Sequence, residues 1–121
     1  MATGFRNLAV YKKAFSLAMD IYNVSKKFPK DGLYSLTSQI RRSSRSVCSN
    51  IGEGYHKRLY ESHFVSKISD SDMENTETQV RLDFALACEY ITKDIFNDYN
   101  ERSEEIGRLL NHMIQSPQKY K

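Results

Sequence analysis

Apolar residues recur every three or four positions along nearly the whole chain, and the only two prolines are Pro29 and Pro117. This spacing gathers apolar side chains on one face of an α-helix. No stretch of useful length alternates apolar and polar residues in the manner of a β-strand. The sequence therefore predicts an all-α chain in which the two prolines mark the ends of helices.

The first two predicted helices lie on either side of the segment "KKFPKDG". Residues 8–27 are predicted to form the first helix, and Asp31 is predicted to cap a second helix that starts at Leu33. Gly52 and Gly54 are predicted to weaken the second helix where it leads into "YHKRLY". The expected apolar faces are Tyr11, Ala14, Phe15, Ala18, Ile21 and Tyr22 in the first helix, and Leu33, Leu36, Ile40, Ser44, Val47, Cys48 and Ile51 in the second.

The third helix is predicted over residues 62–90, and the fourth begins near Thr92, a plausible N-cap. The middle of the third helix, "SDSDMENTETQ", is almost wholly polar. Its expected anchors are Phe64, Val65, Ile68, Val80, Phe84, Ala87 and Ile91, and the fourth helix has the stripe Ile95, Phe96, Tyr99, Ile106, Leu109, Leu110 and Met113. Four amphipathic helices with short connections predict one domain, residues 1–121, folded as an antiparallel up-down four-helix bundle.

Charge is distributed unevenly along the sequence. Residues 1–60 contain 11 Lys and Arg against 3 Asp and Glu, a net charge of +8. Residues 61–121 contain 7 Lys and Arg against 12 Asp and Glu, a net charge of −5. This asymmetry predicts an anionic partner for the first half, or else neutralisation between the two halves within the fold or across an oligomer.

The segment "SQIRRSSRSVCSNIGEG" contains three of the five arginines of the basic half. It lacks the GxxxxGK[ST] pattern of a phosphate loop and no strand precedes it, so it is interpreted as one helix with an apolar face and two polar faces. Arg41 and Arg45 lie one helical turn apart, a spacing that suits contact with phosphates. The candidate nucleic-acid-binding residues are Lys26, Lys27, Lys30, Arg41, Arg42, Arg45, Lys57 and Arg58.

A second polar stripe on the same helix flanks the apolar face. Its candidate structural or interface residues are Gln39, Ser46, Asn50 and Glu53, in line with Arg42. Polar groups beside an apolar stripe must find hydrogen-bond partners when they are buried. We therefore expect some of them to pair with the polar middle of the third helix, residues 74–79, or to form a subunit interface.

Catalytic and metal-binding patterns are weak. The chain has no Glu-x-x-His pair, and Cys48 and Cys88 form no CxxC motif. Cys48 is expected on the core stripe, where an inert thiol is the usual case. No catalytic residue, metal or cofactor is predicted. Without a signal-peptide pattern or a long apolar run, a cytoplasmic protein with no membrane association is expected.

The segments "FRNLAVYKKAFSLAMDIY", "LTSQIRRSSRSVCSNIGEG" and "NTETQVRLDFALACEYI" resemble a bacterial family of four-helix-bundle proteins encoded in intervening sequences of 23S rRNA genes and often labelled ribosomal proteins. The accessory variability proteins of diversity-generating retroelements are similar. The resemblance runs from Phe5 to about Met113. Its most specific part is Gln39-Ile40-x-Arg42 followed by Ser46, Asn50-Ile51 and Glu53-Gly54, and it departs from the family pattern at Cys48, Gly52 and Arg81.

The resemblance implies an antiparallel bundle that assembles as a ring-like homopentamer with a basic surface and binds nucleic acid. For a retroelement-linked gene, it also implies a reverse transcriptase as partner. It supplies no catalytic residues. The label "ribosomal protein" does not by itself place the chain in a ribosome.

The sequence thus predicts a non-enzymatic oligomeric bundle that binds structured RNA or DNA through a basic surface. The alternative is a protein-interaction scaffold without nucleic-acid binding, in which the acidic third helix neutralises the basic second one. Its expected ion-pair partners for the arginines are Asp70, Asp72, Glu74 and Glu77. A third hypothesis is an enzyme or metal site hidden in the polar core.

Overall fold

The computed structural model describes residues 4–29 and 35–121 of the chain. The long elements are α1 (Ala9–Val24), α2 (Leu36–His56), α3 (Glu61–Ala87) and α4 (Lys93–Gln115). Short 3₁₀ turns flank them at η1 (Phe5–Asn7), η2 (Ser25–Lys27) and η3 (Pro117–Tyr120). The described residues contain no β-strand, which agrees with the all-α prediction.

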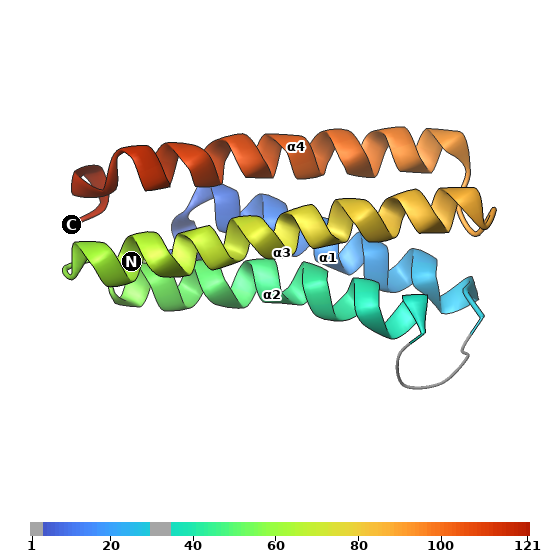
Figure 1. Ribbon diagram of the computed structural model, residues 1–121, viewed down its shortest axis with the longest axis horizontal. Helices are drawn as coiled ribbons and strands as arrows, with labels where there is room; N and C mark the ends of the chain where they lie inside the picture. Colours follow the sequence, from blue (N-terminus) through green and yellow to red (C-terminus); the bar gives the residue numbers. More distant parts are fainter. Residues whose placement is uncertain (1–3, 30–34) are drawn as a thin grey trace.

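Consecutive helices run in opposite directions, and α1 packs against α4 to close the bundle (Figure 1). The contact between α2 and α3 is the most extensive of the four. Both η1 and η3 lie at the end of the bundle where α2 turns into α3 (Figure 1). There Phe5 lies against Gly52, and the ring of Tyr120 stacks on that of Phe64. The predicted antiparallel up-down four-helix bundle is confirmed.

The first helix is shorter than predicted, because the chain tightens into η2 after Val24. The start of α2 is capped by Ser35, whose Oγ accepts a hydrogen bond from the Ser38 N–H at 3.3 Å. A serine in this position satisfies one of the free N–H groups of the first turn. The predicted cap, Asp31, and the predicted start, Leu33, lie outside the described residues.

The third helix ends at Ala87, before the predicted end at residue 90. Glu89 adopts the left-handed conformation with φ of 62°. The N–H of Tyr90 then bonds to the carbonyl of Ala85 at 2.8 Å, and the N–H of Glu89 to that of Leu86 at 2.9 Å. These two hydrogen bonds together form a Schellman motif, in which the left-handed position is usually occupied by glycine. The predicted N-cap of α4 is confirmed, since Thr92 Oγ1 accepts from the N–H of Ile95 at 3.2 Å.

The helix α2 continues through Gly52 and Gly54 and ends at His56, two residues later. Gly54 permits tight packing on α3. A Cβ at this position would lie 2.8 Å from Cδ1 of Ile68 and 3.2 Å from Cβ of Lys67. A Cβ at Gly52 would meet only the Phe5 ring, at 3.6 Å.

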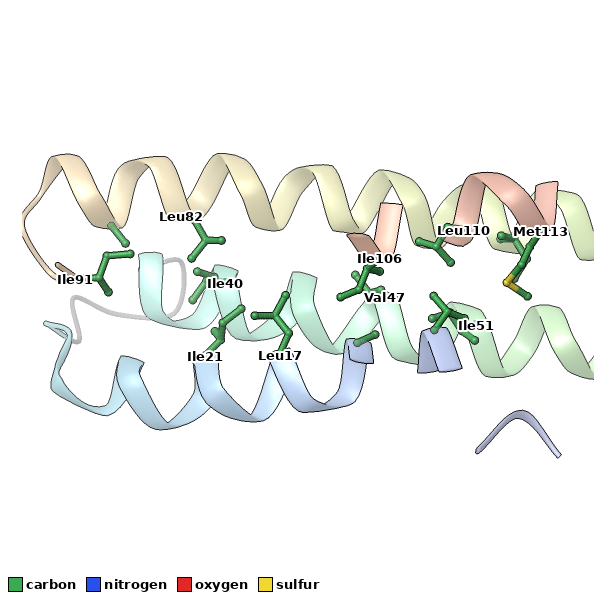
Figure 2. Close-up of a cluster of buried hydrophobic side chains, with 14 of the residues drawn as sticks. Leu17, Ile21, Ile40, Val47, Ile51, Leu82, Ile91, Ile106, Leu110 and Met113 are labelled. Atoms are coloured by element: carbon green, nitrogen blue, oxygen red, sulfur yellow. The ribbon is translucent and has the colours of Figure 1, made fainter. Parts of the chain in front are cut away.

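The core is a cluster of mostly aliphatic side chains between the helices, part of which is drawn in Figure 2. In α2 and α4 the predicted stripes are correct: Ile40, Val47 and Ile51 are buried in the first, and Ile106 and Leu110 in the second. Cys48 is half-buried beside this core. Regular spacing alone was enough to identify these faces.

The apolar faces of α1 and α3 differ from the prediction in part. Phe15 is 50% exposed, and Val80 and Phe84 are 44% and 58% exposed. Ala87 is also exposed, whereas Leu82 and Ala85 are buried in its place. In the second half of α3, the face that points into the bundle includes buried polar residues. The prediction from large apolar side chains therefore placed the inward face on the wrong side of this half of the helix.

Small polar side chains fill the middle of the bundle. Thr78 Oγ1 of α3 donates to Ser43 Oγ of α2 at 2.9 Å, and Ser71 Oγ donates to the carbonyl of Val47 at 2.8 Å. Towards α4, Asn75 Nδ2 donates to the carbonyl of Ser103 at 2.9 Å. The hydroxyl of Ser103 donates back to Asn75 Oδ1 at 2.9 Å and accepts from Gln79 Nε2 at 3.0 Å. Each of these bonds joins α3 to a neighbouring helix.

The predicted polar stripe of α2 does not make these bonds. Asn50 Nδ2 donates to the carbonyl of Ser46 in its own helix at 2.9 Å. Glu53 forms an ion pair at 3.0 Å with Lys67, near the start of α3 and not in its middle. Gln39 lies in a hollow together with Arg81 and Phe84. The pairing with residues 74–79 comes instead from Ser43, which faces α3 directly.

Candidate nucleic-acid interface

Arg41 is held by the end of the first helix. Its Nε donates to Ser25 Oγ at 2.8 Å, and its Nη2 donates to the carbonyl of Tyr22 at 3.3 Å. The guanidinium lies 4.7 Å from the centre of the Tyr22 ring. Arg41 therefore joins α2 to α1 and is half-buried, which leaves less of it free for a ligand than the sequence suggested.

Tyr22 is surrounded by three cations. Besides Arg41, Lys26 Nζ lies 5.0 Å and the Arg45 guanidinium 5.6 Å from the ring centre. The electron-rich face of an aromatic ring attracts each cation, but it does not cancel their mutual repulsion. Among the ion pairs of the described residues, none joins these side chains to a carboxylate. An anion bound here would relieve that repulsion.

A solvent-open hollow of about 700 Å³ extends along α2 beside this cluster. We call it the arginine–serine groove. It is lined by Arg41, Arg42 and Arg45 together with Ser35, Thr37, Ser38, Ser46 and Ser49. Guanidinium and hydroxyl groups both donate hydrogen bonds to phosphate oxygens, and small serines leave room for the phosphate between the arginines. Arg42 and Arg45 are exposed, as a ligand would require.

Of the eight predicted basic residues, only the three arginines of α2 line the arginine–serine groove in the described structure. Lys57 and Arg58 follow the far end of α2, and Lys57 is 12 positions beyond Arg45, about 18 Å along a helix. Arg58 is held locally, 4.4 Å from the centre of the Tyr55 ring and with Nη1 donating to the Tyr55 carbonyl at 3.1 Å. Lys27 is exposed in η2. Lys30 lies outside the described residues.

The neutralisation expected for a scaffold is not seen in the described part of the chain. Glu77 pairs with Arg81 of its own helix. Asp72, which lies on α3, has a pKa raised by partial burial. Among the described residues, no ion pair links α3 to Arg41, Arg42 or Arg45. Within residues 4–29 and 35–121, Arg41, Arg42 and Arg45 thus have no carboxylate partner.

A second groove adjoins the first and was missed by sequence reasoning. This aromatic groove, of about 720 Å³, is lined by rings and sulfur atoms that include Phe5, Tyr11, Phe15, Met19 and Cys48, and it shares Arg45 and Ser49 with the arginine–serine groove. The sequence feature that could have indicated this groove is the four-residue spacing of residues 11, 15 and 19, which gives α1 a second apolar stripe.

Chemistry at Cys48 is limited by protonation of its thiol. Burial raises the pKa of the Cys48 thiol to about 11, so little of it is thiolate near neutral pH. In the part of the chain that the structure describes, no three His, Cys, Asp or Glu side chains gather into a metal-binding group. Over the same residues, no helix has the length and apolar composition needed to span a membrane.

Fold and surface together define a four-helix bundle with a cation-rich second helix. Residues 6–112 match the family described as 23S rRNA-intervening sequence protein, and the chain belongs to this family. This confirms the family predicted from the sequence.

A solved structure is similar over most of its length. It is a protein of unknown function from the S23 ribosomal protein family of Bacteroides thetaiotaomicron, with 29% sequence identity and a TM-score of 0.78. The match covers 88% of this chain and 95% of that one. The chain has no match among curated proteins.

Proposed function

We propose that this protein is a non-enzymatic, oligomeric bundle that binds structured RNA or DNA through the arginine–serine groove. The observation that supports this most strongly is the cluster of Lys26, Arg41 and Arg45 around Tyr22, which has no carboxylate partner in the described chain. Clusters of like charge are usually neutralised within a fold. An unneutralised cluster in a hollow of hydroxyl groups suits a polyanion.

Arg42 and Arg45 would make the phosphate contacts, since both are exposed along the groove. Arg41 would act mainly by position: its bonds to Ser25 and Tyr22 fix the guanidinium beside the groove wall. Because phosphate contacts are not specific for sequence, this groove would set affinity and orientation more than base preference.

Assembly would involve α3. Met73, Val80 and Phe84 are 65%, 44% and 58% exposed and lie on one stripe of the helix, at spacings of seven and four residues. An apolar stripe facing solvent is typical of a helix that docks on another protein. Copies in an oligomer would place several arginine–serine grooves on one particle, and multivalent contact would raise its affinity for a long nucleic acid.

The direct test is fluorescence anisotropy with a stem-loop RNA and a DNA duplex, titrated with salt. Arg42→Ala/Arg45→Ala is compared with Lys93→Ala/Arg108→Ala, which removes the same charge from exposed positions on α4. The first variant should weaken binding and lower the salt slope by about 2, one for each lost phosphate contact. If both variants bind like the wild type, the groove is not the interface, and the scaffold alternative gains support.

A further inference from the structure

The two grooves form one continuous surface with different chemistry on each side. Arg45 and Ser49 line both hollows, so the boundary between basic and aromatic walls runs along α2 itself. On the aromatic side the Tyr11 and Phe15 rings are stacked with centres 6.0 Å apart. The Phe5 ring meets Tyr11 edge-on at 4.9 Å. Phe15 is half exposed, so its ring offers a free face to a ligand.

We propose that the aromatic groove holds unpaired bases of the nucleic acid whose backbone lies in the arginine–serine groove. The inference rests on the function proposed above and narrows its ligand to a single-stranded segment, such as a loop. Phosphates lie along Arg42 and Arg45, and the adjacent bases turn across Ser49 and stack on Phe15. A basic groove beside exposed aromatic rings is the usual arrangement in proteins that bind single strands.

Paired bases do not suit this surface. In a duplex the faces of the bases are stacked on one another, so they cannot reach a ring on the protein. A single strand exposes both its phosphates and its base faces. A groove of about 720 Å³ lies within the range of sites that hold small organic ligands, so it has room for a base.

Charge also favours a nucleotide as the occupant. The rim of the aromatic groove contains Arg45 and Lys57, for which the described residues supply no ion pair, whereas Lys67 on the same rim is paired with Glu53. A purely apolar partner would leave these cations next to a dry surface without compensation. A nucleotide supplies an apolar face and an anion together.

The test uses three probes with the full-length protein: a short oligouridylate, an RNA duplex of the same length, and inorganic polyphosphate, which carries charge but no bases. Phe15→Ala is compared with Leu59→Ala, which truncates a side chain that is 69% exposed outside both grooves. Circular dichroism checks folding, and light scattering after size-exclusion chromatography checks the mass of the assembly.

Phe15→Ala should weaken oligouridylate binding about five- to 150-fold, the range for loss of one stacked base, and leave polyphosphate binding unchanged. Leu59→Ala should change neither. Equal affinity of wild type for single strand and duplex, with no effect of Phe15→Ala, would overturn the inference while leaving the proposed function intact. A fall in assembly mass for Phe15→Ala would also overturn it, since the groove would then be a contact between copies. If Arg42→Ala/Arg45→Ala binds all three probes normally, the proposed function itself fails.

Discussion

Two glycines in α2 should respond in opposite ways to the same substitution. At Gly54, alanine would put a methyl group 2.8 Å from Cδ1 of Ile68 and 3.2 Å from Cβ of Lys67. Ile68 is fully buried and cannot swing into solvent. Alanine gains about 1 kcal/mol of helix propensity over glycine, but overpacking of a filled core costs about 1–3 kcal/mol. We therefore expect a net destabilisation of Gly54→Ala of up to about 2 kcal/mol, because two neighbours must move.

Gly52→Ala is the matched control, since its new methyl group would touch only the Phe5 ring, at 3.6 Å. With no clash, it should be stabilised by about 0.5–1 kcal/mol. Thermal unfolding followed by circular dichroism at equal protein concentrations measures both changes, and the two melting temperatures should differ by about 8 °C. A Gly54→Ala protein as stable as Gly52→Ala would refute the packing argument.

Three further predictions concern the interior, the end of α3 and the thiols. Asn75→Ala removes both bonds to the buried Ser103 and should lower the free energy of unfolding by about 1–3 kcal/mol, measured by urea unfolding; an unchanged midpoint with unchanged slope would contradict this. Glu89→Gly relieves the left-handed backbone at φ of 62° and should raise stability by about 0.5–1 kcal/mol, whereas Glu89→Ala, which keeps a Cβ, should not. With a thiol-reactive disulfide reagent at pH 8, the exposed Cys88 should react first and Cys48 slowly. The reason is that the pKa of Cys48 is raised to about 11, so its thiol stays protonated until the pH approaches that value. A fast phase of the reaction that survives Cys88→Ser would be inconsistent with this.

The sequence predicted the helices and the architecture because those depend on local signals. Spacing of three and four residues identified the inner faces of α2 and α4, and Thr92 was recognised as a cap from its residue type. The candidate site was predicted only in part. Arg42 and Arg45 do lie on an exposed groove, but the sequence could not show that Tyr22 of another helix gathers Lys26 and Arg41 beside them.

Proximity in sequence was also a poor guide to which basic side chains lie together on the surface. Lys57 follows Arg45 by about 18 Å along the helix, so it lines the aromatic groove and not the arginine–serine groove, and Arg58 lines neither. The aromatic groove is formed by η1, α1 and α2 together. The four-residue spacing of Tyr11, Phe15 and Met19 on α1 is also that of a core face, so only the packing of the three elements shows that these residues line a groove.

The amino-acid sequence by itself determined the helical class, the four segments, the family and the excess of positive charge in the first half. Tertiary structure alone decided which face of α3 points inward. Val80 and Phe84 are the more apolar residues, yet Asn75 and Thr78 are buried. The physical reason is that a polar side chain can be buried at low cost when a partner meets it, and the partners, Ser103 and Ser43, come from other helices.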